Sequence, residues 1–92
     1  MQQLTQKCIA EFGGTFLLCL VVLTTHNYLA IGAALAIGVF LGGGAYNPAV
    51  AVSLLMNKEI SAKEIVVLIV VEFIAAISAY YASKALLSLK YK

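Results

Sequence analysis

The chain has 92 residues, of which 63% are hydrophobic and 11% are charged, and its formal net charge is +2. A soluble domain of this size has too small an interior for so much apolar surface, so the composition indicates an integral membrane protein. The six basic residues are all lysines and form no cluster, which argues against a nucleic-acid partner. With one histidine, and no residues at metal-ligand or nucleophile–base spacing, we expect no enzyme, metal or other cofactor. The two cysteines, Cys8 and Cys19, are interpreted as small apolar side chains and not as a disulfide.

The first apolar stretch runs from about residue 6 to residue 25 and is long enough for one membrane-spanning helix. Within it, Ala10 and Gly14 are four residues apart, a spacing that lets another helix approach closely. Glu11 lies beside these small residues. A carboxyl group inside a spanning helix indicates a functional site, because exposing it to lipid is costly. The alternatives are that Glu11 reaches the nearby membrane interface or that it is protonated.

A second apolar segment, from about residue 28 to residue 43, follows a short turn at residues 24–27. So short a turn predicts that the first two helices are antiparallel neighbours. Small residues recur at every fourth position of the second segment, namely Ala30, Ala34, Gly38 and Gly42. Because positions four apart share one face of a helix, this stripe predicts tight packing against another helix.

Near the centre of the chain, one helix is predicted to end and another to begin. The glycines at 42–44 end the second helix and free the backbone for extended or left-handed conformations. Asn47 is a strong N-cap residue, and Pro48 suits the first position of the helix that follows. We therefore expect a re-entrant loop and a half-helix over residues 44–57, about half as long as a ~30 Å hydrocarbon core. Non-helical backbone survives at that depth only inside protein or beside a wet cavity, so the sequence predicts a pore.

The third spanning helix is expected over residues 62–88, where Ser61 and Glu64 form a capping box at its start. Glu72 is predicted to point into the bundle, because it shares a helix face with four small residues: Ala75, Ala76, Ala79 and Ser83. Tyrosines and lysines late in this segment suit the far membrane interface. Since there is no linker and no internal repeat, residues 1–92 are predicted to form a single domain.

Three motifs, in this order along the chain, resemble those of the aquaporin and glycerol-facilitator family. Residues 43–49, Gly-Gly-Ala-Tyr-Asn-Pro-Ala, are similar to the family's half-helix signature. Residues 10–16, Ala-Glu-Phe-Gly-Gly-Thr-Phe, resemble its first-helix motif, and residues 72–76 fall where its third helix usually carries Gln followed by Gly-Ala. Family members carry two such halves in opposite orientation, and this chain resembles a single half-length repeat.

The resemblance implies an all-α membrane fold of three transmembrane helices plus one re-entrant half-helix, which is half of the family's fold. It also implies that Glu11 accepts hydrogen bonds from N–H groups of the loop, and we expect Glu72 to be a second loop-supporting carboxyl. The fold would be completed by antiparallel dimerisation of two copies. Three lysines are expected at one end, at residues 7, 58 and 63, and three at the other, at residues 84, 90 and 92. This balance allows insertion in both orientations.

The function implied is a passive channel for water or small uncharged solutes, in the lipid bilayer of a plasma or cell membrane. The residues expected to line the pore are Gly43, Gly44, Ala45, Tyr46, Asn47, Pro48, Ala49 and Val50. His26 is either a hydrated turn residue or a further pore-lining side chain at the mouth. Val50 occupies a position where the family's second half usually carries Arg, so we expect a loose filter. The alternatives are a non-conducting membrane interaction module and a fragment of a longer channel.

Overall fold

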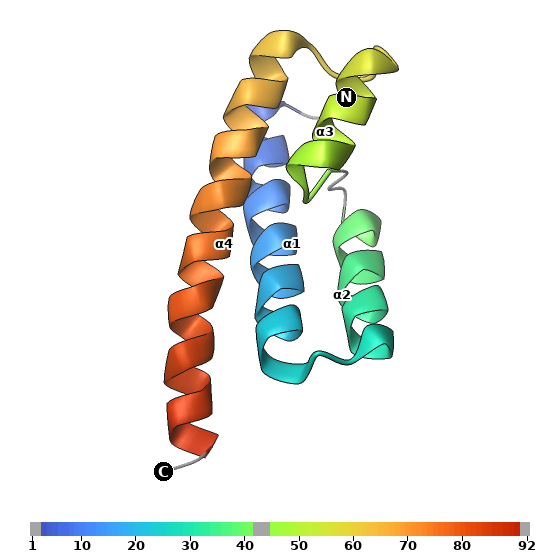
Figure 1. Ribbon diagram of the computed structural model, residues 1–92. Helices are drawn as coiled ribbons and strands as arrows, with labels where there is room; N and C mark the ends of the chain where they lie inside the picture. Colours follow the sequence, from blue (N-terminus) through green and yellow to red (C-terminus); the bar gives the residue numbers. More distant parts are fainter. Residues whose placement is uncertain (1–2, 42–44, 91–92) are drawn as a thin grey trace.

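The structure is a computed structural model that describes residues 3–41 and 45–90. It is all-helical over these residues, with no β-strand in either range. The four helices are α1 (Leu4–Thr25), α2 (Tyr28–Phe40), α3 (Pro48–Met56) and α4 (Ala62–Lys90). Figure 1 shows that α1 and α4 lie side by side and run in the same direction, while α2 and α3 run the opposite way. The helices α1 and α4 therefore begin at the same end of the molecule.

The contact between α1 and α4 forms the centre of the bundle. The buried residues of α4 recur every three or four positions, so they form one face: Ile65, Leu68, Glu72, Ala75, Ala79 and Ser83. The small side chains among them, Ala75, Ala79 and Ser83, let α1 approach closely. The buried residues of α1 are Glu11 and Thr15. Glu72 thus points into the bundle, as its helix face predicted. At the start of both helices, Lys7 Nζ lies 2.6 Å from Glu64 Oε2.

Two of the helices are long and apolar enough to cross a membrane. The 22 residues of α1 and the 29 residues of α4 correspond to about 33 Å and about 44 Å, against a hydrocarbon core of ~30 Å. The 13 residues of α2 correspond to only about 20 Å. Two of the three expected transmembrane helices therefore reach spanning length among the described residues. The third, α2, is shorter and ends at Phe40, before the glycines, which are poor helix formers.

Local capping explains where the shorter helices begin. The Asn27 side chain accepts hydrogen bonds from the N–H groups of Leu29 and Ala30 and so starts α2. The small-residue stripe of α2 faces inward as predicted, since Ala34 and Gly38 are its buried residues. Its fourth member, Gly42, lies outside the described residues.

The remaining helix ends also agree closely with the sequence. One of the two hydrogen bonds of the predicted capping box of α4 is present, with the Glu64 N–H donating to Ser61 Oγ at 3.1 Å. The helix α1 starts two residues before the expected position, because Gln6 Oε1 accepts a hydrogen bond from the Gln3 N–H. At the other end of the chain α4 continues to Lys90 instead of ending at 88.

Candidate functional site

The start of α3 is the first component of the candidate site. Asn47 Oδ1 accepts a hydrogen bond from the Ala49 N–H at 2.7 Å, which confirms the predicted N-cap, and Pro48 occupies the first helical position. Because the oxygen is used for capping, the Asn47 amide NH2 group has no acceptor among the described residues. The N-terminus of a helix also carries a partial positive charge. The start of α3 therefore offers hydrogen-bond donors and a positive electrostatic potential to a molecule next to it.

Glu11 holds the chain just before this helix. Its Oε1 accepts from the Ala45 N–H at 2.8 Å, and its Oε2 accepts from the Tyr46 N–H at 2.9 Å. These bonds link α1 to the segment that leads into α3, and Glu11 is 3% exposed. They are the bonds that the family resemblance implies for this carboxyl. A carboxylate that accepts two backbone N–H bonds is well compensated, so its burial is explained.

Tyr46 fixes the position of the same segment along the bundle. Its backbone has a φ of 58°, and its side chain is 4% exposed. The ring lies between two glycines, because a Cβ atom added to Gly14 would be 2.1 Å from Tyr46 Cε1, and one added to Gly38 would be 3.0 Å from Cε2. The Tyr46 hydroxyl donates a hydrogen bond to the Gly38 carbonyl. Since Gly14 is the eleventh of the 22 residues of α1, the chain enters α3 about halfway along α1.

An open cavity of about 550 Å³ borders the start of α3. It lies between α1 and α4, and its lining comprises Thr15, Leu18, Cys19, Val22, Leu23, Tyr46, Asn47, Pro48, Glu72, Phe73, Ala76 and Tyr80. Most of these side chains are apolar. The polar ones are few and gather near the helix start, which is the usual composition of a small-molecule site.

Glu72 and Thr15 are the buried polar side chains of this cavity. Each residue is 2% exposed, and neither the Glu72 carboxyl oxygens nor Thr15 Oγ1 have a hydrogen-bond partner among the described residues. Glu72 lies within side-chain hydrogen-bonding reach of Glu11, so a proton on one carboxyl group can be shared with the other. Within the described part of the chain Glu72 makes no hydrogen bond to the loop, so its expected loop-supporting role is not visible there.

The other residues expected at the pore are distributed differently. Asn47, Pro48 and Tyr46 border the cavity, whereas Ala45 is buried in a small apolar cluster with Ala51 of α3 and Ile65 of α4. Ala49 and Val50 are exposed on α3, and neither of them lines this cavity. The expected positions Gly43 and Gly44 lie outside the described residues.

His26 is an expected pore residue that does not line the cavity. It is exposed at the turn between α1 and α2, where its left-handed φ of 52° ends α1. In Figure 1 this turn lies at the opposite end of α1 from α3. Within one copy of the chain, His26 therefore does not join Asn47 at the cavity.

Sequence reasoning missed two features of the site. One is the role of Gly14 and Gly38 as the two sides of the Tyr46 slot. Both had been recognised only as small residues that allow helices to pack. The other is Thr15, which lies one helical turn after Glu11 and so shares its face. That spacing was a usable signal for Thr15, whereas no local signal connects Tyr46 with Gly38.

Fold and site together define a helical membrane protein in which a short helix begins inside the bundle, beside an open cavity. The chain is 34% identical, over 96 aligned positions, to the glycerol uptake facilitator protein-like 6 of Lactiplantibacillus plantarum. The match covers 90% of this chain but 44% of that relative, so the chain spans less than half the relative's length. The similarity supports a relationship to the aquaporin and glycerol-facilitator family. No protein-family model matches the chain, and no solved structure matches it.

Proposed function

We propose that this chain forms half of a passive channel for water and small neutral solutes such as glycerol. The observation that carries the proposal is the start of α3 halfway along α1, where the Asn47 amide lies at the edge of an open cavity and has no acceptor among the described residues. A solute that reaches this point can accept a hydrogen bond from the amide. The positive end of α3 opposes the passage of cations. The similarity to a glycerol uptake facilitator-like protein supports the same function.

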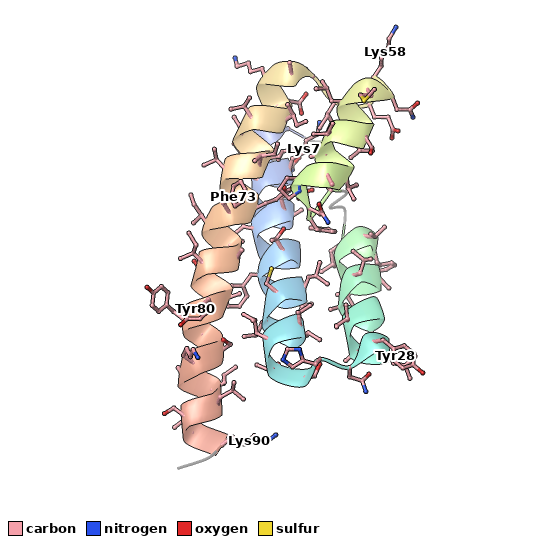
Figure 2. All side chains as sticks on the ribbon, in the orientation of Figure 1. Lys7, Tyr28, Lys58, Phe73, Tyr80 and Lys90 are labelled. Atoms are coloured by element: carbon pink, nitrogen blue, oxygen red, sulfur yellow. The ribbon has the colours of Figure 1, made fainter. Side chains whose placement is uncertain are left out.

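The pore would be completed by a second copy in the opposite orientation. In one copy the cavity is open, and α1 is the only described helix that α2 contacts, which leaves many apolar side chains of α2 exposed. Figure 2 shows Lys7 and Lys58 at one end of the molecule and Lys90 at the other, a balance that favours insertion both ways. In such a pair, α2 would be the third membrane segment of each copy, and the two Asn47 side chains would meet near the membrane midplane.

The selectivity of the proposed pore would be set by small side chains. Ala49 and Val50 would line the path, together with the backbone of Gly43 and Gly44, and Val50 brings neither charge nor hydrogen-bond donors. We therefore expect glycerol and urea to pass as well as water, with some proton leakage. Stopped-flow measurements on proteoliposomes would compare these fluxes. Fast water flux without glycerol or proton passage would show that another residue narrows the mouth, with His26 as the first to be tested.

The role of Asn47 in conduction can be separated from its role as an N-cap. Asn47→Leu removes both the cap and the luminal donors, whereas Asn27→Leu removes the N-cap of α2, which does not line the cavity. A lost cap lowers stability by about 1 kcal/mol in either case. We expect water flux to collapse in Asn47→Leu and to persist in Asn27→Leu. Equal flux through the two assembled variants would exclude Asn47 from the conducting path.

The orientation of the chain is tested by labelling single cysteines. In a background where Cys8 and Cys19 are replaced by alanine, cysteine is introduced at Thr5 or at Ser88, near opposite ends of the fold. A membrane-impermeant reagent added to intact vesicles should label about half of the chains at each position. If one position is labelled in all chains and the other in none, the antiparallel pair is wrong.

A further inference from the structure

Two carboxyl groups lie close together inside the bundle, and their surroundings differ. Glu11 is 3% exposed, and its two oxygens accept hydrogen bonds from the backbone N–H groups of Ala45 and Tyr46. Glu72 is 2% exposed, and neither of its carboxyl oxygens has a hydrogen-bond donor among the described residues. It lies within side-chain hydrogen-bonding reach of Glu11. The two groups therefore share one buried space but not the same supply of donors.

Two ionised carboxyl groups would be strongly unfavourable in this position. Like charges at hydrogen-bond distance repel each other, and burial removes the water that would otherwise screen them. Two carboxylates also cannot form a hydrogen bond with each other, because an ionised carboxyl group is only an acceptor. A single proton removes both difficulties, since it reduces the total charge of the pair to one and turns one acceptor into an O–H donor.

The backbone donors indicate which carboxyl group holds that proton. The N–H groups of Ala45 and Tyr46 stabilise a negative charge on Glu11, with one bond to each oxygen. Glu72 receives no comparable bond among the described residues, so its ionised form would be buried without compensation. None of the described lysines lines the cavity that Glu72 borders, and the chain contains no arginine. The surroundings therefore favour the negative charge on Glu11 and the proton on Glu72.

We propose that Glu72 is a positioning residue, whose carboxyl group carries a proton and donates an O–H···O hydrogen bond to the Glu11 carboxylate. This bond fixes the Glu11 carboxylate from the side of α4, while the carboxylate itself holds the segment that leads into α3. Glu72 thus acts on the start of α3 through Glu11, without a bond of its own to the described part of the loop. The inference concerns the folded chain and does not require the pore to conduct.

Infrared spectroscopy locates the proton. The purified chain in lipid nanodiscs at neutral pH should show the C=O stretching band of a protonated carboxyl group. We expect Glu72→Gln to lose this band, because the protonated carboxyl group is replaced by an amide of the same size. Glu59→Gln is the matched control and should keep the band, since Glu59 is exposed and accepts a hydrogen bond from Asn57. Absence of the band from the wild type, or its persistence in Glu72→Gln, would overturn the proposal.

Amide hydrogen exchange tests whether this proton positions the loop. Glu72→Gln keeps a donor to Glu11, because its NH2 group can replace the O–H group, whereas Glu72→Met keeps the approximate size without a donor. We expect the N–H groups of Ala45 and Tyr46 to exchange as slowly in Glu72→Gln as in the wild type. In Glu72→Met they should exchange at least about tenfold faster, because a hydrogen bond to a charged acceptor is lost.

The two variants together decide the role of Glu72. Equal exchange in Glu72→Met and Glu72→Gln would show that Glu72 does not position the loop. Faster exchange in Glu72→Gln than in the wild type, or its failure to fold, would show that a neutral donor is not sufficient, and would also overturn the proposal. Should Glu72→Met fail to fold, the comparison of Glu72→Gln with the wild type still decides. Water flux without the infrared band contradicts this inference alone, and the band without flux contradicts the channel alone.

Discussion

The slot that holds Tyr46 gives the sharpest test of how the fold positions α3. Replacing Gly14 by alanine adds a methyl group that would lie 2.1 Å, 2.6 Å and 2.8 Å from three ring atoms of Tyr46. The ring must then leave the slot, and its hydrogen bond to the Gly38 carbonyl breaks. Overpacking of this kind costs about 1–3 kcal/mol, and the lost hydrogen bond about 1 kcal/mol more. Alanine regains about 1 kcal/mol through its higher helix propensity.

Gly13 provides the control, because nothing lies within 4 Å of a Cβ atom added there. Gly13→Ala gains the same helix propensity without the steric conflict, so the propensity term cancels between the two variants. We expect Gly14→Ala to be less stable than Gly13→Ala by roughly 2–4 kcal/mol. The measurement is the free energy of unfolding in mixed detergent, followed by circular dichroism.

A double-mutant cycle identifies the cause. In a Tyr46→Ala background the ring is absent, so Gly14→Ala should cost no more than Gly13→Ala. Equal stability of the two glycine variants in the wild-type background would refute the slot. An undiminished difference in the Tyr46→Ala background would show that the added methyl group meets something other than the ring.

Three further substitutions test the contacts around the site by the same unfolding measurement. Glu11→Gln replaces one acceptor by an NH2 group that faces a backbone N–H, so we expect a loss of about 2–3 kcal/mol, and a loss below 0.5 kcal/mol would argue against both hydrogen bonds. Tyr46→Phe keeps the ring and removes the bond to Gly38, for an expected loss of ~1 kcal/mol; no loss would mean that the ring alone holds the loop. Lys7→Met breaks a partly exposed ion pair with Glu64 and should cost less than about 1 kcal/mol, so a larger loss would reveal a second role for Lys7.

The features that the sequence predicted are those governed by a few neighbouring residues. Asn47 and Pro48 specify the start of α3, and Ser61 with Glu64 specifies the start of α4, because a cap depends on groups within one helical turn. The inward face of Glu72 follows from helical periodicity in the same way.

The features that the sequence did not predict depend on contacts between distant segments. The slot for Tyr46 joins Gly14 of α1 to Gly38 of α2, and nothing in the spacing of these residues specifies that the tyrosine enters between them. The helix α2 was expected to extend to about residue 43, because the apolar sequence continues past Phe40. It ends at Phe40 in the structure, and the glycines that follow favour helix less strongly. Glu72 has no hydrogen-bond donor among the described residues, and this depends on which groups of α1 and α3 surround it. The sequence of α4 alone does not specify those groups.

The unequal lengths of the two parallel helices give the protein an uneven surface profile. The pair formed by Lys7 and Glu64 sets α1 and α4 level at their starts. From there α1 continues for 18 residues to Thr25 and α4 for 26 residues to Lys90. In Figure 1 the end of α4 extends past the α1–α2 turn. The eight additional residues correspond to about 12 Å of helix. That exceeds the thickness of one headgroup layer, about 5–7 Å. If both helices cross the bilayer from the Lys7–Glu64 end, the end of α4 therefore extends beyond the headgroups on the other side. A membrane holding copies in both orientations would show such protrusions on both leaflets when its topography is imaged.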